Sequence, residues 1–212
     1  MTAEEYCTAH SSAEPDTLAR LYRHTYLTRL YPHMCCEPLQ GRLLVMLTRM
    51  IAPRRILELG TFSGYSTLCF AEGMPAGSVI DTVEIDDEAE DGLRELFAAS
   101  PRAADIRLHI DDALDAIPAL ASPDSPWDLV YIDANKRLYC DYYRAVRPHV
   151  RPGGYILADN VLWGGKMLSP DEARDAQSRG IAEFNAMVAA DPAVDKVMLP
   201  LRDGLTLIRI KP

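Results

Sequence analysis

Short apolar runs and amphipathic stretches alternate along most of the chain. Apolar runs of this length that are bounded by glycine and charged residues are typical of buried strands, whereas the longer amphipathic stretches indicate helices. Regular alternation of the two predicts a parallel sheet with helices on both faces. The expected elements are strand 55–59, helix 64–73, strand 79–84, helix 87–99, strand 105–110, helix 112–120, strand 128–132, helix 136–149 and strand 154–159.

The N-terminal part of the chain precedes this alternation and contains two helical patterns. Residues 16–31 are amphipathic, with Asp16 as a plausible N-cap. Residues 39–51 are more apolar, so we expect this second helix to pack on the sheet.

The C-terminal part predicts a different connection between strands. After a loop at 164–172 and a helix near 173–190, two apolar runs at 194–201 and 205–210 are joined by Arg-Asp-Gly. Asp-Gly between two apolar runs is a hairpin signal. We therefore expect an antiparallel edge at the end of the chain.

Acidic and amide side chains follow two of the predicted strands. Asp133 comes directly after an apolar run, and Asp159 and Asn160 follow another. Ligands bind at the carboxyl ends of strands in an open α/β sheet, so neighbouring strands would bring these oxygen atoms together. Such a donor set suits Mg²⁺, Mn²⁺ or Ca²⁺ better than zinc. For either aspartate alone the alternative is capping of the following helix; the three residues together favour a metal ion.

A glycine-rich turn follows the first predicted strand. Gly60 and Gly64 flank Phe62, which stands where a dinucleotide-binding turn has its second glycine, so a pyrophosphate would meet a side chain. Glu84 ends the next strand, where an acid can hold ribose hydroxyls. A nucleoside without a phosphate bridge fits better, and S-adenosylmethionine (SAM) is the common one; Glu58 would favour its sulfonium cation. The alternative is a glycine that only packs at the strand–helix turn.

Composition agrees with this interpretation. The chain has 212 residues, of which 48% are hydrophobic and 25% charged. This length and composition suit one compact α/β domain over residues 1–212. A net charge of −9 argues against nucleic acid as a partner. We expect no membrane partner, because no apolar run approaches the roughly 20 residues of a bilayer span. The N-terminus lacks signal-peptide features, and the five cysteines include no Cys-x-x-Cys pair, so we expect free thiols and a cytoplasmic location.

Several spaced motifs now carry a family resemblance, which runs from about Met34 to the C-terminus. The chain resembles the cation-dependent, SAM-dependent O-methyltransferases, the group of caffeoyl-CoA and catechol O-methyltransferases. The resemblance implies a class I methyltransferase, Rossmann-like fold, with a seven-stranded, mostly parallel sheet and an antiparallel C-terminal hairpin strand. The motifs are Glu58–Ser66, Val83–Asp86, Asp112–Ala113, Ile132–Lys136, Ala158–Trp163 and Asp203–Thr206.

The same resemblance implies the chemistry. It predicts a Mg²⁺-type ion on Asp133, Asp159 and Asn160, and methyl transfer from SAM to one hydroxyl of a vicinal aromatic diol, such as a catechol, hydroxycinnamate or related phenol. Lys136 matches the family's proton-accepting lysine; its alternative is a solvated helix end. We also expect a homodimer, in which residues 1–51 form N-terminal helices covering each site.

Further residues match positions that contact cofactor or acceptor. The expected cofactor contacts are Met34, Glu58, Gly60, Ser66, Glu84, Asp112, Ala113 and Asp133. For Met34 the alternative is core packing, and for Asp112 it is a helix cap. Trp163 would stack on the acceptor, unless it only packs under a loop.

The sequence leaves two points open. A SAM- or nucleoside-binding module without catalysis is the alternative function, although neither Lys136 nor a predicted metal ligand is missing; a nicotinamide dehydrogenase is disfavoured by Phe62 and the metal ligands. The family pattern Asp-Ala-Asp-Lys here has Asn135 at its third position. The arginines near the predicted helix 136–149 are spread out, so we expect a small diol rather than a coenzyme A ester, and a solvated face for Arg137, Arg144, Arg147 and Arg151.

Overall fold

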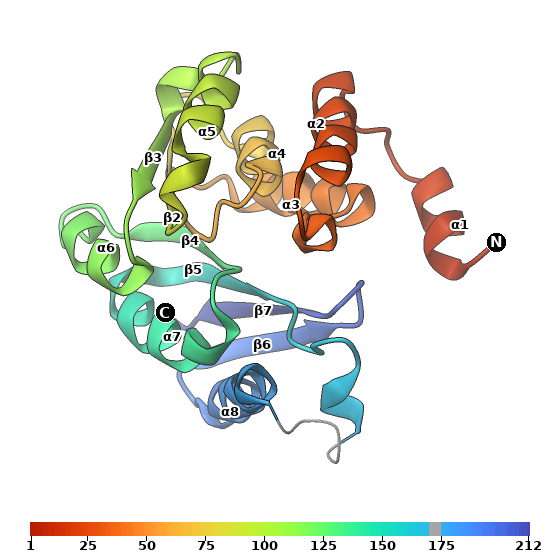
Figure 1. Cartoon of the computed structure of the whole chain (residues 1–212). Helices are drawn as coiled ribbons and strands as arrows, with labels where there is room; N and C mark the ends of the chain where they lie inside the picture. The colour runs from red at the N-terminus through yellow and green to blue at the C-terminus, as the bar shows by residue number, and fades with distance from the viewer. Residues whose placement is uncertain (170–174) are drawn as a thin grey trace.

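The computed structural model describes residues 1–169 and 175–212. One seven-stranded sheet has the order β3-β2-β1-β4-β5-β7-β6, in which β1 to β5 are parallel and β7 is antiparallel to both of its neighbours (Figure 1). This confirms the predicted sheet; the antiparallel strand lies one position inside the edge, which β6 forms. The strands are β1 Arg55–Leu59, β2 Val79–Glu84, β3 Ile106–Ile110, β4 Trp127–Ile132, β5 Val150–Asp159, β6 Val194–Leu199 and β7 Leu205–Ile210.

Alternate side chains of the strands bury into two apolar layers, one on each face of the sheet. On one face Ile56 and Leu129 pack with α3, α4 and α5, and on the other Leu57 and Val130 pack with α6, α7 and α8. The helices of the two layers are α3 Pro38–Ile51, α4 Tyr65–Gly73, α5 Glu90–Ala98, α6 Ala113–Leu120, α7 Tyr139–Val146 and α8 Ala176–Ala190.

The N-terminal segment differs from prediction in three places. Helix α2, Asp16–Thr28, begins after Pro15, so Asp16 is its first residue and not its N-cap. It stops at Thr28, and a 3₁₀ turn (η1, Pro32–Met34) separates it from α3 because proline disfavours helix in the residue before it. A short helix, α1 Ala3–Ala9, was not predicted, although Thr2 and Glu5 form a capping box that marks its start.

Several predicted helices are shorter or interrupted. The expected helix 136–149 consists of η4 (Lys136–Leu138), α7 and η5 (Arg147–His149), with Pro148 in the last turn. Three further 3₁₀ turns lie between the regular elements. Turn η2 (Asp87–Ala89) precedes α5, η3 (Ala103–Asp105) precedes β3, and η6 (Lys166–Leu168) follows β5. Part of the expected loop 164–172 and the start of the expected helix 173–190 lie outside the described residues.

The C-terminal hairpin closes against the segment that follows β5. Backbone N–H groups of Val161 and Leu162 donate to the carbonyls of Gly204 and Asp203, at 3.2 and 2.8 Å. Gly204 has φ +87°, and a Cβ there would lie 2.6 Å from Leu162 Cγ. Only glycine fits this approach, which holds the β6–β7 turn beside the end of β5.

All five cysteines are free thiols, and Cys35, Cys36, Cys69 and Cys140 are buried. None of the helices in the described part of the chain has the length and apolar character needed to cross a bilayer.

Candidate active site

The carboxyl ends of β4 and β5 lie next to one another. Ile132 pairs with Ala158 in the parallel register, so Asp133 and Asp159 extend the two strands side by side. The Tyr139 hydroxyl spans both strand ends, at 3.2 Å from the Ile132 carbonyl and 2.9 Å from the Asp159 carbonyl. The structure thus brings together the two aspartates that the sequence placed 26 residues apart.

Asp159 is held by side chains rather than acting as a helix cap. Its Oδ2 accepts from Gln40 Nε2 and from the Tyr131 hydroxyl, each at 2.6 Å, and its Oδ1 accepts from the Asn160 N–H at 2.8 Å. The carboxyl is buried at 2% exposure. Gln40, on α3, was missed by the sequence analysis; a single amide in a mostly apolar helix was the available signal.

Lys136 lies in the same cluster. Its Nζ donates to Asp133 Oδ1 at 2.6 Å and lies 5.3 and 6.0 Å from the ring centroids of Tyr139 and Trp163. The side chain is 8% exposed, which rules out a solvated helix end. Helix α8 packs against the Lys136 backbone at Gly180, where a Cβ would collide with the Lys136 carbonyl oxygen. Lys136 is therefore a fixed, buried amine.

Negative charge is concentrated here in a buried environment. Burial raises the pKa of the Asp133 carboxyl to about 6, and the nearby Asp159 carboxylate adds to the rise while Lys136 opposes it. Burial and Asp159 also raise the pKa of Asp203, which accepts from the Gly164 N–H at 2.5 Å. Carboxylates in such surroundings are stabilised by a bound cation.

The donor set fits a divalent ion of the Mg²⁺ class. The candidate donors are the Asp133 and Asp159 carboxylates and the amide of Asn160, the residue directly after Asp159. The described part of the chain contains no cluster of three His, Cys, Asp or Glu side chains that could hold a metal ion. Asp159 Oδ2 already accepts two hydrogen bonds, but Asp159 Oδ1 and both oxygens of Asp133 keep at least one lone pair each beyond the hydrogen bonds above. Oxygen donors alone match Mg²⁺, Mn²⁺ or Ca²⁺.

A cation from the C-terminal hairpin also reaches this region. Arg202 Nε lies 3.5 Å from Glu37 Oε1, and its Nη2 donates to the His33 carbonyl. Its φ of +50° is unusual for a non-glycine residue. Through these contacts the β6–β7 hairpin holds residues 33–37 near Asp133 and Asp159. The sequence indicated the hairpin turn but not this contact, which joins residues 169 positions apart.

The glycine turn after β1 forms the other half of the site. Gly60 has φ +96°, and a Cβ there would collide with the Asp133 carbonyl oxygen, so this turn requires glycine. Phe62, at φ +49°, donates its N–H to Glu84 Oε2 at 2.7 Å. Glu84 Oε1 accepts from the N–H groups of Ile85 and Asp86, each at 3.0 Å. Glu84 therefore holds the turn, and its Oε2 keeps one lone pair for a hydroxyl donor.

Four predicted cofactor contacts line one narrow cleft, which we call the cofactor cleft: Met34, Gly60, Ser66 and Asp133. Met34 is half exposed, so it is not a core residue. Cys35 and Cys36 also line the cleft as buried thiols, and burial raises the pKa of both.

The remaining predicted contacts lie around this cleft. Glu58 is buried in β1, and burial raises its pKa to about 7. Hydrogen bonds from the hydroxyl groups of Ser66, Thr67 and Thr82 oppose this rise. Asp112 caps α6 by accepting from the Leu114 N–H at 2.8 Å, which is the alternative role named for it. Buried Ala113 follows at the end of β3, next to the Glu84 end of β2.

Comparison with known proteins identifies the family. The O-methyltransferase family model matches residues 8–211. A catechol O-methyltransferase from Niastella koreensis is 32% identical over 186 residues, covering 85% of this chain and 84% of the relative. A caffeoyl-CoA O-methyltransferase from Stellaria longipes is 31% identical over 183 residues, covering 83% and 76%.

Solved structures show the same fold with cofactor bound. The O-methyltransferase TomG from Streptomyces achromogenes, in complex with SAM, has a TM-score of 0.89 at 29% identity and covers 100% of both chains. A methyltransferase from Podospora anserina, bound to S-adenosylhomocysteine (SAH), has a TM-score of 0.90 at 28% identity, covering 99% of this chain and 94% of that one. The chain therefore belongs to the O-methyltransferase family and is a SAM-dependent O-methyltransferase.

Proposed function

We propose that the chain methylates one hydroxyl of a vicinal aromatic diol, with a divalent cation held by Asp133, Asp159 and Asn160. The observation that carries this proposal is the buried amine of Lys136, 2.6 Å from Asp133 and beside the Asp159 strand end. A base and two carboxylates at one strand edge suit activation of a hydroxyl group. A binding module without catalysis would have no need for such a cluster.

The bound cation would stabilise negative charge on the acceptor oxygen and orient both diol oxygens. Lys136 accepts the proton of the reacting hydroxyl at Nζ. Lys136 would do so as the neutral amine, whose lone pair takes the proton from the hydroxyl oxygen, while Asp133 would be one of the residues that hold the cation. The acceptor oxygen then forms a bond to the methyl carbon as the carbon–sulfur bond breaks, and SAH leaves.

The aromatic surroundings support a small planar acceptor. Trp163 lies beside Lys136, with its ring centroid 6.0 Å from Nζ, and we propose that it stacks on the acceptor ring. Arg137 and Arg144 are exposed, as predicted. Arg147 and Arg151 are partly exposed and pair with Asp191 and Asp128 at 2.8 and 2.5 Å. None of these contacts forms a basic cluster for a coenzyme A tail, which favours a catechol or hydroxycinnamate.

Chelation is the direct test of the metal. We expect EDTA to abolish methylation of a catechol panel, and Mg²⁺ or Mn²⁺ to restore it, because the hydroxyl is then poorly ionised at neutral pH. Initial rates with SAM, measured before and after chelation, give the answer. Full activity in EDTA would rule out the cation-dependent mechanism.

We propose that Met34, Glu58, Gly60, Ser66, Glu84, Asp112, Ala113 and Asp133 contact SAM, with Glu84 holding the ribose hydroxyls. Glu84→Ala should weaken SAM affinity by about tenfold or more, because a charged acceptor is lost. Calorimetry with SAM measures this change.

Glu84→Gln separates the two roles of this side chain. It keeps one oxygen, which can accept from the Phe62 N–H, and replaces the oxygen that accepts from Ile85 and Asp86 with an amide nitrogen, so it should weaken the turn less than alanine does. An unchanged SAM affinity in both variants, with thermal stability lowered more in Glu84→Ala than in Glu84→Gln, would assign Glu84 to the turn only.

We further propose that residues 1–212 act as one domain in which residues 1–51 cover the site, and that two copies form a homodimer. The Arg202 contacts to Glu37 and His33 support the covering role. The net charge of −9 supports a partner set without nucleic acid. The five free thiols support a reducing compartment such as the cytoplasm.

A further inference from the structure

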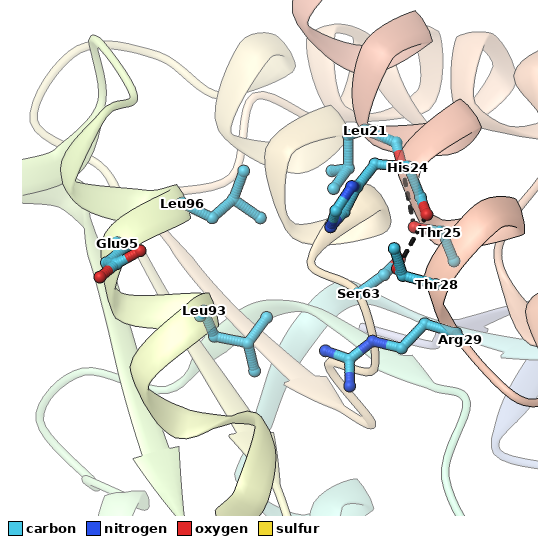
Figure 2. Close-up of a pocket in the computed structure, with 10 residues that line it drawn as sticks. Leu21, His24, Thr25, Thr28, Arg29, Ser63, Leu93, Glu95 and Leu96 are labelled. Atoms are coloured by element: carbon cyan, nitrogen blue, oxygen red, sulfur yellow. Dashed lines mark hydrogen bonds between the residues drawn. The ribbon is translucent and has the colours of Figure 1, made fainter.

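A second, larger hollow lies between α2 and α5, and we call it the α2–α5 cleft (Figure 2). Its volume is about 540 Å³, within the range of small-molecule sites. It shares only Ser63 with the cofactor cleft, and Cys35 Sγ lies 3.4 Å from the Ser63 hydroxyl between the two. None of the residues proposed to contact SAM, metal or acceptor lines it.

The α2–α5 cleft has an apolar wall and a polar wall. Leu93 and Leu96 of α5 extend into it from one side, and Leu21 of α2 closes it from above (Figure 2). His24 and Arg29 extend into it from the α2 side. A ligand in this space would meet hydrocarbon on one side and nitrogen donors on the other.

The donors on the polar wall have no acidic partner in the part of the chain that the structure describes. The Arg29 guanidinium lies 6.0 Å from the centroid of the Phe62 ring, and no carboxylate of the described residues lies within ion-pair distance of it. The His24 ring likewise has no hydrogen-bond acceptor among the described residues. Glu95, the acidic residue of the lining, points away from the cleft in Figure 2.

Arg29 thus faces the cleft without an acidic partner among the described residues, although the chain has a net charge of −9. Arginine binds carboxylate and sulfonate groups through charge-assisted hydrogen bonds. We propose that the α2–α5 cleft is a second binding site for a small organic anion with an aromatic or aliphatic body, its charged group on Arg29 and His24 and its apolar part against Leu93 and Leu96. This site does not depend on the proposed acceptor or metal.

A pair of fluorescent probes tests the proposal. 1-Anilinonaphthalene-8-sulfonate carries an anionic group on an aromatic body, and N-phenyl-1-naphthylamine is the same body without the charge. With the full chain saturated with SAH, we expect one anionic probe to bind per chain, at least tenfold more tightly than the neutral probe. Arg29→Gln should lower the affinity for the anionic probe about tenfold or more and leave the neutral probe unchanged.

Arg23→Gln is the matched control, because Arg23 is exposed on α2, the helix that Arg29 directly follows, and lies outside the cleft. It should leave both affinities at the wild-type value. Leu96→Glu places a carboxylate opposite Arg29 and should abolish anionic-probe binding; thermal melting confirms that each variant folds. Equal affinity of wild type and Arg29→Gln for the anionic probe would overturn the proposal. Self-association that covers the cleft would also overturn it. In that case the anionic probe would bind only after dilution to the monomer, which sedimentation experiments would identify.

Discussion

Replacing Lys136 with alanine is expected to slow the methyl-transfer step by about 10²–10⁴-fold, the usual contribution of a general base. Metal and SAM affinity should stay near wild type, because neither the proposed ion ligands nor Glu84 is altered. Raising the pH should partly restore the rate, since more of the diol then arrives already ionised. Single-turnover rates as a function of pH measure both effects.

Lys136→Arg distinguishes a base from a fixed positive charge. Arginine can keep the ion pair that Lys136 makes with Asp133 at 2.6 Å, but it does not give up its proton. We expect Lys136→Arg to be as slow as the alanine variant. Arg137→Ala, which removes an exposed neighbouring cation, should retain the wild-type rate. Activity restored by arginine would reduce Lys136 to a structural charge.

Asp159→Asn is expected to lower both divalent-ion affinity and turnover, each by more than about 100-fold. This is a larger effect than the loss of a residue that only hydrogen-bonds to a metal ligand. The substitution keeps the size of the side chain and an oxygen acceptor for Gln40 and Tyr131. Mn²⁺ binding followed by electron paramagnetic resonance measures the ion, and methylation of a catechol measures turnover.

Tyr131→Phe gives a graded comparison. It removes one hydroxyl donor from Asp159 Oδ2 and leaves the carboxylate and Gln40 in place. We expect about a 10–100-fold loss of ion affinity, restored at high Mn²⁺ together with activity. If Asp159→Asn kept wild-type Mn²⁺ affinity, Asp159 would not be a metal ligand, whatever its effect on turnover.

The strands and the motifs at their ends could be predicted because their physical causes are local. Apolar runs such as 129–132 identify strands, and the aspartates that follow them occupy a sheet edge set by parallel topology. Helix ends were less predictable. Asp16 looks like an N-cap in sequence, yet α2 begins there after Pro15, and the expected helix 136–149 is interrupted near Pro148.

The sequence by itself determined the individual strands, the turn at Gly60 and the oxygen-rich strand ends, because each depends on a few consecutive residues. Only the tertiary structure decided how these groups are held. Gln40 reaches Asp159 across 119 residues, and Arg202 reaches the His33 carbonyl across 169. Burial of Lys136 likewise needs α8 to pack at Gly180. Such contacts depend on how whole elements pack, and a pattern of neighbouring residues does not contain that information.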